Sequence, residues 1–205
     1  MVPTPDELAE RRRDASRARI LQVAADRLAE HGYAATSLAD VAILGALEQT
    51  VVNFHFPTKE DLVEAVLKTG IDHSKAAIDS AVAELASDAT GADRIEAAIS
   101  AYLRAISDQR NMTRANIRCY RSVPPVLRRG LSVHMREFVE TWTELLESGR
   151  SDGSLRPDLD PPVVARMIIA ALNASVTWML PDDIENVTEQ FGRALLTGVK
   201  SHPNQ

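Results

Sequence analysis

The chain contains very few of the residues that stabilise small secreted proteins or that build β-sheets. Its 205 residues include a single cysteine, Cys119, and only 4% of them are aromatic. One cysteine excludes an internal disulfide framework and suits a reducing compartment, so we expect a cytoplasmic protein. No stretch shows sustained alternation of apolar and polar residues, whereas Ala, Leu, Val and Ile are abundant. The sequence therefore predicts an all-α fold in which helices pack on helices.

A secretion signal and a membrane-spanning segment are not expected either. The first residues, MVPTPDELAERRR, have no apolar signal core. The most apolar window, residues 163–180, is as long as a membrane span, but Arg166 and Asn173 interrupt it. This window predicts a buried core or interface helix, and no membrane is expected as a partner.

Motifs for catalysis, metal binding or cofactor binding are missing. The sequence has no glycine-rich phosphate loop, no pair of cysteines for zinc and no nucleophile motif. Its five histidines are scattered, and a solvated helix face explains the neighbours Asp72 and His73. Cys119 lies between Arg118 and Arg121, which predicts either a reactive thiol or a buried small hydrophobe. We therefore expect no enzyme, no metal and no cofactor.

The charge distribution gives two opposing indications about nucleic acid. The net charge is −6, and residues 1–60 contain seven Lys and Arg against nine Asp and Glu. Locally, however, one acid, Asp14, accompanies a cluster of arginines: Arg11, Arg12, Arg13, Arg17 and Arg19. This cluster predicts either a basic arm that meets DNA phosphates or an ordinary solvated charge run.

Residues 36–62 predict two short helices separated by a sharp turn and followed by a third helix. Thr36 and Ser37 are good N-cap residues, and the apolar run after them breaks at residues 45–46. A second short helix is expected over residues 48–54. Thr58 and Asp61 then form a capping pair for a helix that starts near Lys59. Helix, tight turn and helix is the arrangement that places a second helix in the major groove of DNA.

The rest of the chain predicts further helices around this element. A flexible arm is expected over residues 1–13 and a helix over residues 14–31. In the helix over residues 59–85, Gly70 and Ser74 predict a kink or a close contact. Apolar periodicity predicts the other helices at these positions: residues 93–108, 111–123, 126–148, 163–180 and 183–200. Residues 163–180 are apolar nearly all round, which predicts that a second subunit covers one side.

Two runs, RARILQVAADRLAEHGYAATSLADVA and HFPTKEDLVEAVL, resemble the N-terminal domain of TetR-family transcriptional repressors over residues 17–67. The segment GSLRPDLDPPVVARMIIAALNASVTWM resembles the penultimate helix of that family. The resemblance implies a helix-turn-helix head with an N-terminal arm over residues 1–58. It also implies a helical ligand-binding and dimerisation body over residues 59–205, with about nine helices in all. The last two helices of each subunit would form a four-helix dimer interface that includes Met167, Ala170, Ala171, Ala174, Phe191 and Leu195.

The resemblance also implies which residues meet DNA. Thr36 or Ser37, together with Lys59, should contact phosphate, and Gln49, Thr50 and Asn53 are candidates for base edges. His55 is a further candidate for the DNA surface, although core packing is the preferred explanation for it. Phe56 is expected in the core below the recognition helix.

This chain departs from the family pattern within the recognition helix. The usual pattern is Ala-Gly-Val-Ser, a variable residue, Gly-Thr, an aliphatic residue and Tyr. Here Glu48 replaces the serine, Val51 replaces the threonine and Asn53 replaces the tyrosine. The last two replacements weaken or remove two groups that usually touch the DNA backbone.

These observations predict a ligand-responsive repressor that binds a palindromic operator on double-stranded DNA as a homodimer, and that responds to a small-molecule effector. The alternative is a small-molecule binding protein of the same fold whose operator recognition is weakened or lost. Candidate ligand-binding residues, each of which could also be plain core, are Tyr102, Met112, Tyr120, Phe138, Trp142, Asn173 and Trp178.

Overall fold

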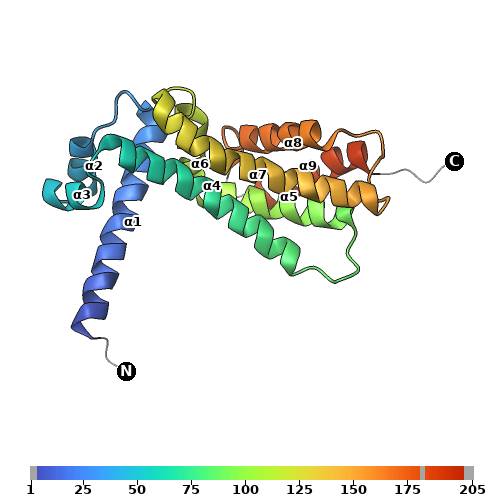
Figure 1. The fold of residues 1–205 in the computed structure, drawn as a ribbon, viewed down its shortest axis with the longest axis horizontal. Coiled ribbons are helices and arrows are strands. Elements are labelled where there is room, and N and C mark those ends of the chain that lie inside the picture. The colour runs from blue at the N-terminus through green and yellow to red at the C-terminus, as the bar shows by residue number, and fades with distance from the viewer. Residues whose placement is uncertain (1–3, 181–182, 201–205) are drawn as a thin grey trace.

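The protein folds into nine helices over residues 4–180 and 183–200, which are the residues that this computed structural model describes (Figure 1). The prediction of an all-α fold is confirmed. The helices are α1 (Pro5–His31), α2 (Leu38–Gly45), α3 (Gln49–His55), α4 (Lys59–Ala83), α5 (Gly91–Asp108), α6 (Arg110–Cys119), α7 (Pro125–Ser151), α8 (Pro161–Ser175) and α9 (Ile184–Val199).

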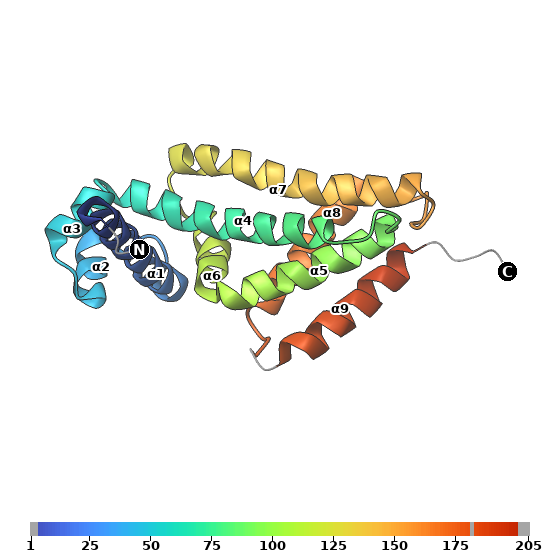
Figure 2. The ribbon, with the colours of Figure 1, turned by 90° about the horizontal axis from the view of Figure 1, so that it is seen from below.

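The molecule has a small head at one end and an elongated body. Helices α1 to α3 and the first turns of α4 form the head, and α4 continues from the head into the body (Figure 1). Seen from below, α4 and α7 run side by side, α5 lies next to α4, and α9 packs on α5 (Figure 2). Local sequence signals set the starts of the helices. Ser37, Thr58 and Thr90 each form a capping box, as predicted for Thr58 with Asp61.

The predicted flexible arm is wrong for the residues that the structure describes, because α1 begins at Pro5. The Thr4 hydroxyl accepts a hydrogen bond from the Glu7 backbone N–H, and the Glu7 carboxylate accepts one from the Thr4 N–H at 2.7 Å. Pro5 stands at the first helical position, where its missing N–H costs nothing. The sequence TPDE is thus a complete helix start, and the first half of α1 projects from the head (Figure 1).

Helix α8 is shorter than expected, since it ends at Ser175 instead of residue 180. The Ser175 and Thr177 hydroxyls donate to the carbonyls of Leu172 and Ala174 at 2.6 and 2.8 Å. After Ser175 the backbone tightens, and the N–H of Thr177 donates to the carbonyl of Ala174. Hydroxyl groups that bind nearby carbonyls compete with regular helix bonds, which explains the early end of this apolar helix.

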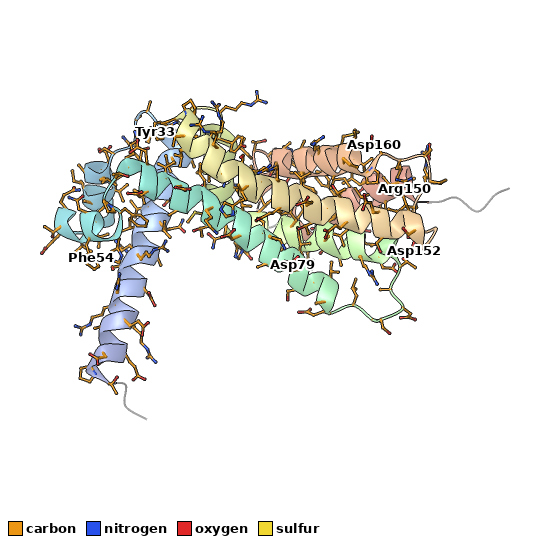
Figure 3. All side chains as sticks on the ribbon, viewed as in Figure 1. Tyr33, Phe54, Asp79, Arg150, Asp152 and Asp160 are labelled. Carbon is orange, nitrogen blue, oxygen red and sulfur yellow. The ribbon has the colours of Figure 1, made fainter. Side chains whose placement is uncertain are left out.

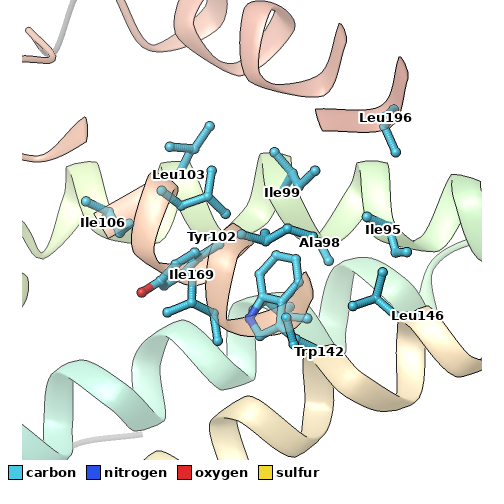
Figure 4. Packing of buried hydrophobic residues seen from close by; sticks show 14 of the residues in the cluster. Ile95, Ala98, Ile99, Tyr102, Leu103, Ile106, Trp142, Leu146, Ile169 and Leu196 are labelled. Carbon is cyan, nitrogen blue, oxygen red and sulfur yellow. The ribbon is translucent and has the colours of Figure 1, made fainter. Parts of the chain in front are cut away.

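Two apolar clusters hold the structure together. The body cluster surrounds Tyr102 and Trp142, which pack edge to face with ring centroids 5.9 Å apart (Figure 4). The head cluster includes Ile20, Val41 and Val52, and it extends into the body through residues such as Met112 and Cys119 of α6. Residues 4–58 therefore share their core with α6, and the predicted domain boundary at residue 58 remains a prediction.

Gly70 brings α4 close to α6. A Cβ atom at Gly70 would lie 3.2 Å from the Cβ atom of Met112 and 3.2 Å from Nδ2 of Asn116. Of the two possibilities that the sequence left open for Gly70, the structure shows the close contact. This contact lets α6 lie between the head and the rest of the body.

The turn between α2 and α3 contains a strained residue. Ala46 has a φ angle of 49° in the left-handed region. A side chain in this region costs energy that glycine avoids, so we expect Ala46→Gly to stabilise the protein by about 0.5 to 1 kcal/mol. Urea unfolding measures the gain as a higher midpoint. As a matched control, Ala39→Gly on the exposed side of α2 should lower stability by about 1 kcal/mol; equal losses in both variants would contradict the argument.

Candidate nucleic-acid interface and ligand cavity

The two short helices of the head are fixed by a small set of contacts. Val41 of α2 and Val52 of α3 are fully buried in the head cluster. Arg19 of α1 donates from Nε to the carbonyl of Gly45 at 2.7 Å, which pins the turn between the two helices. Val52 is the only fully buried side chain within α3, so the other positions of this helix remain at or near the surface.

The outer side of α3 carries polar groups that suit base recognition. Gln49, Thr50 and Asn53 are all exposed. Nε2 of Gln49 donates to Oδ1 of Asn53 at 2.8 Å, so the two amides form one hydrogen-bonded pair. Amide side chains can bind the N6 and N7 edge of adenine in the major groove. The structure thus presents the predicted base-reading residues to the solvent, and their contact with bases remains a prediction.

The predicted phosphate-binding residues have different surroundings. Thr36 is only 3% exposed, and its hydroxyl donates to the carbonyl of Gly32 at 2.9 Å. Of the alternatives Thr36 and Ser37, the structure therefore favours Ser37, which is half-buried at the N-terminus of α2. Lys59 is half-buried at the start of α4, with Nζ 4.1 Å from the centre of the Tyr33 ring. The Tyr33 hydroxyl donates to Glu60 at 2.6 Å and holds this corner together.

His55 and Phe56 join α3 to α1. Phe56 is buried, which confirms its predicted place in the core. His55 is half-buried, and its Nε2 lies 2.7 Å from the hydroxyl of Ser16. Burial lowers the pKa of His55, and the positive charges of Arg13 and Arg17 lower it further. His55 therefore combines core packing with a position at the edge of the candidate DNA surface.

Val51 and Phe54 complete this edge. Val51 is half-buried and offers no hydrogen bond to a phosphate. Phe54 is 65% exposed at the end of α3 beside α1, and the Arg13 guanidinium lies 5.2 Å from its ring centre (Figure 3). Phe54 was not among the predicted site residues, although a large apolar residue at the exposed end of a recognition helix is itself a signal of contact.

The body encloses a cavity of about 210 Å³ between α4, α5, α6, α7 and α8. Four of the predicted ligand-binding residues line it: Tyr102, Tyr120, Phe138 and Asn173. Eight further lining residues were not predicted: Gly70, Ile71, Ser74, Thr113, Asn116, Ile117, Arg121 and Met135. Gly70 and Ser74 could have been predicted, because these two small residues interrupt the apolar stripe of α4 on the side where the cavity lies.

The other predicted ligand-binding residues do not line this cavity. Met112 is buried against Gly70 in the head cluster, and Trp142 is fully buried in the body cluster. Trp178 lies after the end of α8, is 56% exposed and stacks on Phe191 with ring centroids 6.2 Å apart. Helical periodicity alone cannot distinguish a filled core position from the wall of a cavity, so ligand contact by these three residues remains a prediction that this cavity does not support.

Seven of the twelve lining residues carry a polar side chain, among them Arg121, and some of these groups have defined hydrogen bonds. The Tyr102 hydroxyl donates to Oδ1 of Asn173 at 2.7 Å. Burial raises the pKa of Tyr102, so the phenol stays a neutral donor. Nδ2 of Asn116 donates to the carbonyl of Leu67 at 2.8 Å. The Asn173 amide N–H groups remain as donors for an oxygen atom of a ligand.

One side of α8 is an exposed apolar stripe. Val163, Met167, Ala170 and Ala174 are all exposed, and Met167 is 64% exposed. Their spacing of four, three and four residues is that of a coiled-coil seam. Of the other predicted interface residues, Ala171, Phe191 and Leu195 are only partly exposed, and the last two pack against the body cluster.

Other kinds of site receive no support from the described residues. Cys119 is fully buried, its Sγ lies 3.7 Å from the carbonyl of Leu28, and burial raises its thiol pKa, which favours the small-hydrophobe interpretation. Across residues 4–180 and 183–200, no group of three or more His, Cys, Asp and Glu could hold a metal ion. Every helix within these same ranges is too short or too polar to cross a membrane.

Comparison with known proteins identifies two matching family models. Residues 20–66 match the model for bacterial regulatory proteins of the tetR family, and residues 88–199 match that for the tetracyclin repressor-like C-terminal domain. The chain is 29% identical to the HTH-type transcriptional repressor KstR2 of Mycolicibacterium smegmatis, over 97% of this chain and 96% of that protein. It is 27% identical to KstR2 of Rhodococcus jostii, over 92% and 93% of the two chains.

Solved structures agree with these matches. The ketosteroid transcriptional regulator KstR2 of Mycobacterium tuberculosis superimposes with a TM-score of 0.78 at 25% identity, covering 91% of this chain and 95% of that one. A regulatory protein of the tetR family from Rhodococcus RHA1 has a TM-score of 0.80 at 24% identity, with 92% and 98% covered, and supports the fold alone.

Proposed function

This chain belongs to the tetR family of bacterial regulatory proteins. On that premise we propose that it is a ligand-responsive repressor in the cytoplasm, and that it binds a palindromic operator as a homodimer. It is a DNA-binding transcriptional regulator by its family and its relatives. One observation carries the proposal: α3 is a short helix held by a single buried side chain, Val52, and it presents Gln49, Thr50 and Asn53 outward at the end of the molecule.

The apolar stripe of α8 supports the homodimer. Val163, Met167, Ala170 and Ala174 form a seam that is narrow enough for close helix approach, because two of its members are alanines. When two copies pack symmetrically, the seam of each copy would be covered by the seam of the other. Two heads held in this way would fit half-sites separated by about 34–36 Å or a multiple of it.

The cavity supports a small, mostly apolar effector that carries a carbonyl oxygen. Ile71, Met135 and Phe138 supply apolar walls, while Asn173 supplies the amide donor for the carbonyl. The relative from Mycobacterium tuberculosis is named a ketosteroid regulator, which agrees with a cyclic ketone as the effector class here.

Helix α6 would carry the effect of the ligand to the head. On one side, Thr113 and Asn116 line the cavity. On the other side, Nδ2 of Asn111 donates to the Asp26 carboxylate of α1 at 2.8 Å, and Cys119 packs on Leu28 of α1. A ligand that displaces α6 would therefore displace α1 and the head with it. It would shift the equilibrium only through its different affinities for the two arrangements.

Operator binding is tested by a mobility shift on DNA from the region upstream of the coding sequence. We expect specific binding of the wild-type protein. Asn53→Ala should weaken it by about 1–3 kcal/mol, since a lost amide–adenine contact costs that much. The matched control is Gln22→Ala, which removes an exposed amide from α1 and should change affinity little. Specific binding that is undetectable at low salt, with and without effectors, would overturn the proposal.

A second candidate function is a small-molecule binding protein without operator recognition, which the departures at Glu48, Val51 and Asn53 favour. This protein would bind a ketone in its cavity but would not distinguish operator from random DNA. Restoring the family residues with Val51→Thr and Asn53→Tyr separates the two possibilities. Affinity that appears only in the double variant would establish the second function.

A further inference from the structure

The exposed part of the cavity wall lies at the end of α6. Of the twelve lining residues, only Ile117 and Arg121 are exposed, whereas residues such as Tyr102 and Phe138 are buried. Ile117 belongs to the last turn of α6, and Arg121 follows the end of this helix. The mouth of the cavity therefore lies beside the C-terminal end of α6, and the side chain of Arg121 stands at it.

The segment of the chain that contains this mouth is rich in arginine and has no acidic residue. Between Asp108 and Glu137 the sequence contains seven arginines and no Asp or Glu, in a chain whose net charge is −6. These arginines are Arg110, Arg114, Arg118, Arg121, Arg128, Arg129 and Arg136. A local excess of positive charge raises the concentration of anions near the surface. The mouth is thus placed where small anions gather.

Arg121 differs from other arginines of this segment because its charged group has no partner. Nη1 of Arg110 donates to the carbonyl of Met179 at 2.7 Å, and Nη1 of Arg128 donates to the backbone carbonyl of Arg121 at 3.4 Å. In the part of the chain that the structure describes, the Arg121 guanidinium itself forms no ion pair with a carboxylate. Its donors are therefore available to a ligand that enters the cavity.

Two acids of α4 lie near the same arginine-rich segment, but neither lines the cavity. Asp72 pairs with Lys68. Oε1 of Glu64 lies 3.0 Å from the place where a Cβ atom of Gly130 would stand, so this carboxylate faces the start of α7. Among residues 4–180 and 183–200, the lining side chains of the cavity thus include one positive charge and no carboxylate.

The turn that carries Arg121 is fixed by its backbone. The N–H groups of Ser122 and Val123 donate to the carbonyl of Cys119 at 2.8 and 3.0 Å. The side chain of Val123 is buried in the head cluster. The backbone of Arg121 therefore keeps its place at the mouth, and only the side chain has to become ordered when a ligand binds.

We propose that Arg121 binds an oxyanion of the effector, a carboxylate or a phosphate group, while the apolar part of the effector fills the cavity. The inference rests on the proposed function and narrows its ligand class to molecules that are apolar at one end and anionic at the other. A guanidinium group can form two parallel hydrogen bonds with either anion. Because Arg121 is exposed, the anion stays in contact with water and avoids the cost of burying a charge.

Two fluorescent dyes that differ in one charged group test the inference. 1-Anilinonaphthalene-8-sulfonate carries an oxyanion, and N-phenyl-1-naphthylamine is the same molecule without it. Titration of the full-length protein with each dye measures the two dissociation constants. Arg121→Gln should weaken binding of the sulfonate dye about tenfold, as expected when hydrogen bonds to a charged group are lost, and should leave the neutral dye unchanged. Arg121→Lys keeps the charge without the planar fork, so its affinity for the sulfonate dye should be intermediate.

Arg129→Gln is the matched control. Arg129 is exposed in the same arginine-rich segment but does not line the cavity, so its loss removes equal charge with an effect of about twofold at most. The melting temperatures of both glutamine variants should match that of the wild-type protein, because both side chains are exposed. A sulfonate dye that binds Arg121→Gln as well as it binds Arg129→Gln would contradict the inference.

Displacement of the sulfonate dye distinguishes the two kinds of anion. The probes share one ring: cyclohexanecarboxylate, cyclohexyl phosphate and the neutral cyclohexanecarboxamide. The anion whose displacing power falls more in Arg121→Gln identifies the group that Arg121 binds, and the amide should displace the dye equally from both proteins. An equal loss for the amide would show that Arg121 only shapes the cavity, which would contradict the inference.

Operator binding is measured separately, so the inference and the proposed function can fail independently. If the wild-type protein binds its operator and Arg121→Gln leaves the affinity for the sulfonate dye unchanged, the inference is wrong and the proposed function stands. If Arg121→Gln weakens only the sulfonate dye but the wild-type protein does not bind its operator, the proposed function is wrong and the anion site at Arg121 stands.

Discussion

Ala170→Glu is expected to convert the protein into single chains and to weaken operator binding at least a hundredfold. Ala170 lies exposed in the middle of the α8 seam, between Met167 and Ala174. In a two-fold symmetric pair, each seam meets its own copy, so the variant would place two carboxylates together in an apolar interface. Burying unpaired charges costs several kcal/mol, which exceeds what an alanine-lined seam can offset. Light scattering measures the mass, and a mobility shift measures the binding.

The control for this prediction is Ala76→Glu on α4. Ala76 is also exposed, but it lies outside the α8 seam, so the same substitution should leave both mass and affinity unchanged. A dimer that persists in Ala170→Glu would show that another surface joins the subunits. Single chains that still bind the operator tightly would show that pairing is not needed for recognition.

The starts and ends of elements in the head could be predicted from the sequence because they depend on local chemistry. Thr58 with Asp61 fixes the start of α4, and residues 45–46 form the turn before α3. Thr4 with Glu7 is a signal of the same kind. The predicted flexible arm is wrong because this local signal already starts a helix at Pro5.

The positions of side chains within the site could not be predicted in the same way, because they depend on contacts between distant residues. Thr36 and Ser37 are adjacent and both suit a helix start, yet the Gly32 carbonyl accepts the hydroxyl of Thr36 and leaves only Ser37 near the surface. Arg12 and Arg13 were part of a cluster in the sequence. Only the direction of α1 past α3 places these two arginines, and not Arg11, beside α3.

The same limit applies to the cavity. Tyr102 and Trp142 have similar patterns in the sequence and pack against each other (Figure 4). Of the two, only Tyr102 lines the cavity. Asn173 could be selected because a polar residue in an apolar helix needs a partner, and it has one in Tyr102. Its remaining N–H donors are the feature that links the cavity to a class of ligand.

Asn173→Leu is therefore expected to abolish the response to the effector while operator binding persists. Leucine keeps the approximate volume of asparagine but removes the amide that would bind the ligand carbonyl. The probes are the bicyclic trans-1-decalone and the four-ring androst-4-ene-3,17-dione, each added to the operator complex. Release of DNA by either probe should need at least tenfold more ligand in the variant, because an unpaired carbonyl costs about 1–3 kcal/mol.

The single variant also leaves the buried Tyr102 hydroxyl without its acceptor, and this should lower the free energy of unfolding by about 1–3 kcal/mol. Tyr102→Phe combined with Asn173→Leu removes both partners, so urea unfolding should show most of this stability restored. The double variant thus separates ligand recognition from folding: it should be nearly as stable as the wild-type protein and still fail to respond. A double variant that regains both stability and response would show that the amide only supports the fold, and that the ligand is held by other groups.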